Sequence, residues 1–137
     1  MSEKPNTAEI KPAATILLLR DAPVFEVLMV KRHHQIDFAS GALVFPGGKT
    51  HAGDDNPAWV EHVVGWDQFD GVQRGLRIAA IREVFEEAGI LLARRRDGGP
   101  MGGESCPMDG RLAVDAVSTD FSDLFGDLDC RLYLEAV

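Results

Sequence analysis

The chain has 137 residues, of which 45% are hydrophobic, and this suits one globular domain with a buried core rather than two domains. Its formal net charge of -8 argues against nucleic acid or an anionic membrane as a partner, because proteins that bind such partners usually cluster Lys and Arg. The one basic run, Arg94 to Arg96, is interpreted as a solvated helix end. The apolar runs are too short to cross a bilayer, so we expect a cytoplasmic protein, with free thiols at Cys106 and Cys130.

After a polar lead over residues 1–12, the chain predicts a series of short strands. Residues 13–19 are apolar with β-branched side chains, which is typical of a buried strand. Residues 24–31 alternate over the length of a strand, so the two segments predict a hairpin. A third strand over residues 42–45 should end in a loop at residues 46–48, because Pro fixes φ and Gly permits conformations that other residues avoid.

Residues 49–75 show no sustained periodicity and are interpreted as an excursion from the main fold. A short helix is expected over residues 58–64, with Asn56 or Pro57 near its start. The excursion also contains three large aromatic residues, Trp59, Trp66 and Phe69. We expect these side chains to anchor it to the body of the protein or to a partner, rather than to stack on a ligand.

Residues 76–88 give the clearest helical pattern in the chain. Apolar residues recur at helical spacing and would share one face, namely Ile78, Ile81, Phe85 and Ala88. Gly89 is expected to end the helix in a left-handed conformation. Further on, a loop is expected over residues 98–103, and strands over residues 111–117 and 132–137. The pattern of strands with one marked helix indicates an α+β fold, or a mixed sheet sandwiched by helices.

Three carboxylates lie close together on this helix. Glu83 is three residues before Glu86 and four before Glu87, so all three project from a face roughly opposite the apolar one. Like charges at this spacing repel unless a cation neutralises them. Two interpretations follow: a solvated acidic face, or a site for a hard divalent cation that bridges a phosphate substrate.

The helix resembles a known motif once its neighbours are included. Residues 82–90 read Arg-Glu-Val-Phe-Glu-Glu-Ala-Gly-Ile and are similar to the second half of the Nudix box, Arg-Glu-U-X-Glu-Glu-X-Gly-U, in which U is a bulky apolar residue. The box begins at Gly48, followed after five residues by Asp54 where the family has Glu. It would therefore span residues 48–90, with an insertion at about residues 55–75. Such an insertion resembles a Nudix subgroup related to the peroxisomal coenzyme A diphosphatases.

This resemblance implies a Nudix-type α/β/α sandwich with a mixed β-sheet over residues 13–137. It implies that Mg²⁺, or alternatively Mn²⁺, is held by the carboxylates of Glu83, Glu86 and Glu87 and by the carbonyl of Gly47. Arg82 would orient a carboxylate, and Glu86 or Glu83 would serve as the general base. Asp54 has a short side chain before a long excursion and is not expected to reach the helix.

A second pattern of the coenzyme A diphosphatases lies upstream of the box. It places Arg32, Gly41 and Phe45-Pro46-Gly47-Gly48 at the expected spacings, so Arg32, Gly47 and Gly48 are candidate substrate-binding residues. His33 and Asp37 depart from the pattern, which has a small residue and a second Arg at these positions. Because Asp37 would repel a phosphate, it weakens the case for coenzyme A.

Two functions remain open from the sequence. The first is hydrolysis of the phosphoanhydride bond of a nucleoside diphosphate linked to another moiety, including coenzyme A and its acyl thioesters. The second is a catalytically inactive or truncated Nudix-fold module that binds a nucleotide. The length left after the insertion is short for a complete Nudix domain, so we expect C-terminal elements to be absent and the exposed sheet to favour a homodimer.

Overall fold

A computed structural model describes residues 8–31, 41–99, 125 and 130–137. The strands are β1 (Ala13–Thr15), β2 (Leu19–Arg20), β3 (Glu26–Val27), β4 (Val30–Lys31), β5 (Leu43–Val44), β6 (Gly47–Lys49), β7 (Val63–Val64), β8 (Arg94–Arg95) and β9 (Cys130–Tyr133). The helices are α1 (Gly71–Ala88) and the 3₁₀ turns η1 (Ala52–Asp55), η2 (Pro57–Glu61), η3 (Trp66–Gln68) and η6 (Leu134–Ala136). Several predictions lie outside the described residues: the roles of Arg32, His33 and Asp37, the thiol of Cys106, and the strand over residues 111–117.

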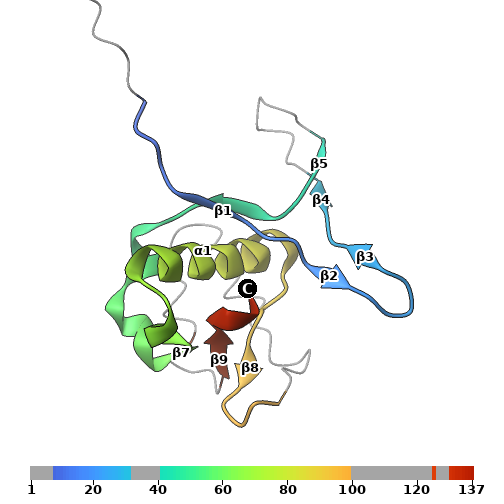
Figure 1. The fold of residues 1–137 in the computed structure, drawn as a ribbon. Helices are drawn as coiled ribbons and strands as arrows, with labels where there is room; N and C mark the ends of the chain where they lie inside the picture. Colours follow the sequence, from blue (N-terminus) through green and yellow to red (C-terminus); the bar gives the residue numbers. More distant parts are fainter. Residues whose placement is uncertain (1–7, 32–40, 100–124, 126–129) are drawn as a thin grey trace, which may run out of the picture.

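Helix α1 lies between two sets of strands (Figure 1). On one side β1 and β6 form an antiparallel pair, and both strands contact α1. On the other side β9 pairs in parallel with β7 and antiparallel with β8. This three-stranded sheet confirms the prediction of mixed pairing, and the combination of α1 with short strands confirms the α+β class.

The predicted buried strand over residues 13–19 is wrong in both extent and burial. The segment divides into β1 and β2, which pair with β6 and β3 respectively. Only the second pairing belongs to the predicted hairpin, with Leu19 opposite Val27. Leu17 and Leu19 are 53% and 59% exposed. The apolar composition was read as burial, but the β2–β3 and β4–β5 pairs extend away from α1 and leave these side chains largely uncovered (Figure 1).

The loop expected at residues 46–48 is also wrong, because Gly47 and Gly48 continue as strand β6. Gly47 lies opposite Thr15 and Gly48 opposite Ala14. A Cβ atom on Gly47 would stand 2.4 Å from the carbonyl oxygen of Ala14. Gly47 therefore serves here to permit close approach of two strands, rather than to turn the chain.

Helix α1 begins five residues before the predicted start. The side chain of Asp70 accepts a hydrogen bond from the backbone N–H of Gln73 at 2.8 Å, which caps the N-terminus. Gly89 ends the helix with φ of 71°, as predicted. The helix is buried on nearly all sides from Ile78 to Phe85. Of the three carboxylates on its polar face, Glu83 is buried, Glu86 is half-buried and Glu87 is exposed.

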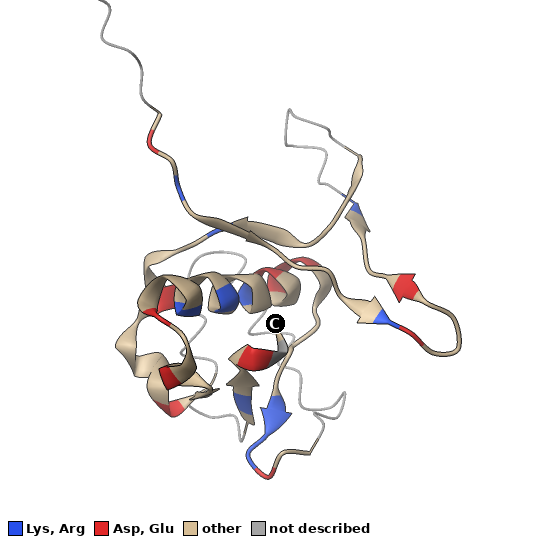
Figure 2. Cartoon of the chain, in the orientation of Figure 1, with Lys and Arg blue, Asp and Glu red and all other residues tan. Residues whose placement is uncertain are grey.

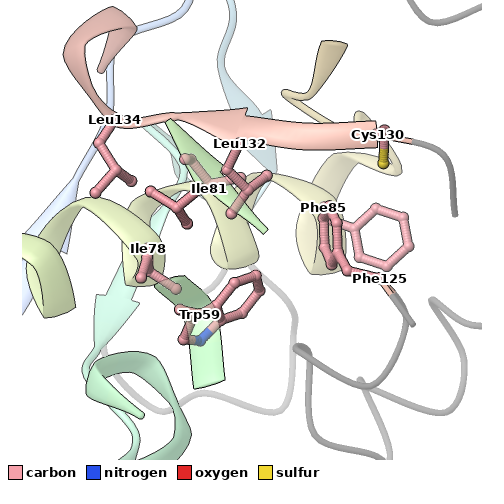
Figure 3. Packing of buried hydrophobic residues seen from close by; sticks show 9 residues of the cluster. Trp59, Ile78, Ile81, Phe85, Phe125, Cys130, Leu132 and Leu134 are labelled. Carbon is pink, nitrogen blue, oxygen red and sulfur yellow. The ribbon is translucent and has the colours of Figure 1, made fainter. Parts of the chain in front are cut away.

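The excursion after β6 is part of the hydrophobic core rather than an appendage. The short helix predicted over residues 58–64 is found only in part, as the 3₁₀ helix η2, whose N-cap is Asn56 and whose first residue is Pro57. The prediction is wrong at its end, where Val63–Val64 form strand β7. Trp59 is fully buried and donates from Nε1 to the carbonyl oxygen of Gly53 at 2.9 Å. It packs among core side chains from α1 and β9, including Ile78, Ile81, Phe85, Cys130 and Leu132 (Figure 3). The prediction that the aromatic residues anchor the excursion is confirmed, since Trp66 and Phe69 also pack against this cluster.

Two predictions near the C-terminus need correction. Arg94 and Arg95 form strand β8 rather than a helix end, although both are exposed as expected. The strand expected over residues 132–137 begins at Cys130 and ends at Tyr133, where the chain turns into η6. Cys130 is buried and forms no disulfide, which is consistent with the predicted reduced thiol. Within the part of the chain that the structure describes, no helix is long and apolar enough to cross a membrane.

Candidate functional site

The guanidinium of Arg82 lies at the centre of a buried ionic cluster. It donates from Nη1 to Glu83 Oε1 at 3.1 Å and to Glu86 Oε1 at 3.0 Å. From Nη2 it donates to the backbone carbonyl of Lys49 at 3.0 Å, which ties α1 to the end of β6. The Arg82 side chain is only 3% exposed. Arg82 is therefore a buried residue that holds the carboxylates of Glu83 and Glu86 in place.

Asp54 completes this cluster, although its side chain was not expected to reach the helix. Its two carboxylate oxygens accept from Arg82 Nε at 2.9 Å and from Arg82 Nη2 at 3.0 Å. Asp54 Oδ2 also accepts from the backbone N–H of His51 at 2.7 Å. The reason is that Asp54 lies on η1, and this turn packs directly against α1. A short acidic side chain suffices because the backbone brings it near.

The charges in the cluster explain the state of Arg82. Burial works to lower the pKa of Arg82, but the hydrogen bonds and charges of Asp54, and then those of Glu86, outweigh burial and raise this pKa above its ordinary value. The guanidinium therefore stays charged. One cation faces three carboxylates, so the cluster has an excess of negative charge when all of them are ionised.

Glu83 is held directly under Gly48. A Cβ atom on Gly48 would stand 2.3 Å from Glu83 Oε1 and 2.6 Å from its carboxyl carbon. The residue is 8% exposed, so the carboxylate is confined between strand β6 and Arg82. Only glycine at position 48 leaves Glu83 room in this orientation.

Glu86 and Glu87 line a pocket of about 820 Å³ together with Gly47 and Gly48. Burial raises the pKa of Glu86 above its ordinary value, the hydrogen bond and charge of Arg82 lower it in part, and the charge of Glu83 raises it again. The lining of the pocket also includes Lys31 on β4. Lys31 was not singled out from the sequence, because a single Lys in a strand carries no motif.

The donor atoms in this region suit a hard divalent cation, because they are carboxylate and backbone oxygens with excess negative charge. Acidic residues gather on the C-terminal part of α1, next to the β1–β6 pair (Figure 2). Across residues 8–31, 41–99, 125 and 130–137, however, no three His, Cys, Asp or Glu side chains converge closely enough to hold a metal ion. Arg82 holds Glu83 and Glu86 through their Oε1 atoms, so a bound ion would have to share these carboxylates with it.

Among the predicted site residues, the structure brings together Arg82, Glu83 and Glu86, with Gly48 against Glu83. Gly47 and Glu87 join Glu86 in lining the pocket. Arg32 lies outside the described residues. The sequence analysis missed Asp54 and Lys31, and for Asp54 the signal was present in its spacing from Gly48.

No protein-family model matches the chain. The chain is 31% identical over 96 residues to acyl-coenzyme A diphosphatase NUDT19 of Xenopus laevis, in an alignment that covers 50% of this chain and 25% of that protein. Its structure is similar to the crystal structure of a Nudix hydrolase from Alicyclobacillus acidocaldarius, with a TM-score of 0.73 and 25% identity. That superposition covers 93% of this chain and 59% of the other. The aligned part thus spans about a quarter of the curated relative's length.

Proposed function

Because the chain belongs to the Nudix superfamily, we propose that it hydrolyses a phosphoanhydride bond in a nucleoside diphosphate linked to another moiety. The observation that carries the proposal is the buried cluster in which Arg82 binds Glu83 and Glu86 beside Gly48. A purely structural salt bridge would need one carboxylate, and a cluster with surplus negative charge is costly unless a cation or a reaction uses it. The two relatives are named as a hydrolase and a diphosphatase, which supports this reaction class.

The donor chemistry favours Mg²⁺ as the cofactor, with Mn²⁺ as the alternative ion. Glu83, Glu86 and Glu87 would hold it, with the carbonyl oxygen of Gly47 as a further ligand. When bound, such an ion neutralises phosphate oxygens and makes a bound water more acidic.

The protein's own residues would then contribute orientation, charge and a base. Arg82 fixes the carboxylates of Glu83 and Glu86 through charged hydrogen bonds, so that little reorganisation is needed during the reaction. Lys31, which lines the same pocket, would neutralise a phosphate oxygen of the substrate. Glu86 is our candidate general base, with Glu83 as the alternative, and would take the proton of the attacking water.

Coenzyme A and its acyl thioesters are the substrates that we propose within this class. The support comes from the spacing of Arg32, Gly41 and residues 45–48, and from the name of the Xenopus laevis relative. Cleavage at the diphosphate would release 3′,5′-adenosine bisphosphate and 4′-phosphopantetheine, with the thiol either free or acylated. Asp37 replaces the second Arg of the pattern, so the affinity for coenzyme A should be lower than an Arg would give.

The experiment is a hydrolysis assay on a panel of diphosphates with and without Mg²⁺. Coenzyme A, an acyl-coenzyme A and ADP-ribose would be compared, and the phosphomonoester products would be identified by mass. Magnesium-dependent cleavage at the diphosphate is expected, with preference for coenzyme A. Saturable binding of all three compounds without any cleavage would instead establish a nucleotide-binding module.

A further inference from the structure

Phe45 contributes an aromatic ring to the pocket that contains Glu86 and Glu87, here called the carboxylate pocket. The residue directly follows strand β5 and is 37% exposed. Trp59 and Phe85, by contrast, are fully buried in the hydrophobic core. The ring of Phe45 can therefore still bury apolar area against a ligand that enters the carboxylate pocket.

Lys31 and Phe45 lie on the same face of the β4–β5 pair. In the register of this pair Lys31 is opposite Leu43, and Val30 is opposite Val44. Side chains alternate between the two faces of a strand, and Lys31, Leu43 and Phe45 are all exposed. Val30 and Val44, on the other face, are half-buried. Phe45 is thus a diagonal neighbour of Lys31, and such neighbours stand about 7–8 Å apart, within reach of aromatic and long side chains.

These two side chains offer a cation and a flat apolar surface to one ligand. Lys31 is the cation among the described residues that line the carboxylate pocket. Its ammonium group can bind a phosphate oxygen, and the face of the Phe45 ring can bind another flat ring. A nucleotide carries this pair of groups, because one ribose joins its phosphate to its base. A sugar or an alkyl chain has no flat ring to place on Phe45.

We propose that Phe45 stacks on the base of the nucleoside that carries the substrate's diphosphate. The inference rests on the proposed function and specifies it, because it assigns recognition of the base to a named side chain. Every base has a π-face, so stacking tolerates different bases. The presence of a base should therefore raise the affinity, whether that base is a purine or a pyrimidine.

The test measures dissociation constants calorimetrically for AMP, UMP and ribose 5-phosphate in the presence of Mg²⁺. These compounds contain no phosphoanhydride bond, so their binding is independent of the proposed hydrolysis. AMP and UMP carry a base and ribose 5-phosphate does not. In the original chain both nucleotides should bind more tightly than ribose 5-phosphate, by roughly 5- to 100-fold for AMP.

Three variants identify the side chain responsible. Phe45→Ala should lower the affinity for AMP by roughly 5- to 100-fold and leave the affinity for ribose 5-phosphate unchanged, which also shows that the variant is folded. Phe45→Tyr keeps the ring and should keep the preference for AMP. Phe25→Ala is the matched control, because Phe25 is 63% exposed and does not line the carboxylate pocket, and it should bind all three compounds as the original chain does.

Each outcome decides for or against the inference. Equal affinities for AMP and ribose 5-phosphate in the original chain overturn it. A preference for AMP that persists in Phe45→Ala, or that is lost in Phe45→Tyr, also overturns it, because the base then lies elsewhere. A preference that is lost in Phe45→Ala and kept in Phe45→Tyr supports the inference even when no diphosphate is cleaved, and in that case only the proposed hydrolysis fails.

Discussion

Arg82 binds both carboxylate oxygens of Asp54, through Nε at 2.9 Å and Nη2 at 3.0 Å, although the two residues are 28 positions apart in the chain. Both side chains are almost completely buried, at 3% and 2% exposure. This pair joins η1 to α1 and leaves Nη1 of Arg82 directed at Glu83 and Glu86. The architecture of the candidate site therefore depends on a residue that carries no proposed catalytic role.

Replacing Asp54 with Asn should be strongly destabilising. The substitution leaves Arg82 as a buried cation without its main partner, which typically costs about 3–5 kcal/mol. Chemical denaturation would measure the free energy of unfolding. Asp55→Asn is the matched control on the same turn, because Asp55 is exposed and should change this free energy by less than about 0.5 kcal/mol. Equal effects of the two substitutions would show that the bidentate pair contributes little.

The two adjacent glycines of β6 should respond differently to substitution with Ala. A Cβ on Gly48 meets the movable carboxylate of Glu83, so Gly48→Ala should displace Glu83 with little loss of stability and reduce turnover by roughly 100-fold. A Cβ on Gly47 meets the backbone of Ala14, which cannot move aside, so Gly47→Ala should cost about 1–3 kcal/mol of stability. Kinetics and thermal unfolding of both variants test this contrast. Unchanged turnover in Gly48→Ala would mean that the position of Glu83 is not critical.

Trp59 should behave as a core residue although it lies in the excursion between β6 and α1. Trp59→Ala removes a fully buried side chain and should cost about 3–5 kcal/mol. Trp59→Phe keeps much of the packing but loses the hydrogen bond to Gly53, and should cost less. The denaturation midpoints of the two variants show which substitution destabilises the protein more. If Trp59→Ala leaves stability unchanged, the excursion is not part of the folded core.

The sequence predicted α1 and its carboxylates well because helical periodicity and the Nudix box depend on local spacing. The hydrophobic face at Ile78, Ile81 and Phe85 and the glycine at the helix end are both found as predicted. The Nudix-type fold is likewise confirmed by the likeness to the solved Nudix hydrolase. The helix and the glycine at its end are properties of one short segment, so the spacing of residues within that segment is enough to predict them.

Features that depend on contacts between distant segments were predicted less well. Asp54 was judged too short to reach the helix, because the sequence does not show that η1 packs against α1. Gly47 and Gly48 were predicted to lie in a loop, because their need to be glycine comes from distant segments: Gly47 closely approaches strand β1, and Gly48 closely approaches Glu83 of α1. Exposure of Leu17 and Leu19 was missed for the same reason, since composition reports hydrophobicity and not what covers it.

The central claim is that the acidic residues of α1 support magnesium-dependent hydrolysis of a diphosphate. The most direct test is the rate of coenzyme A and ADP-ribose cleavage as a function of Mg²⁺ concentration in Glu86→Gln and Glu87→Gln, with Glu61→Gln as an exposed control on η2. These substitutions remove charge but little volume, so the fold should persist. We predict a loss of at least about 100-fold in kcat for Glu86→Gln and for Glu87→Gln, with the original rate in the control. Full turnover by either variant at saturating Mg²⁺ would contradict the role assigned to that residue.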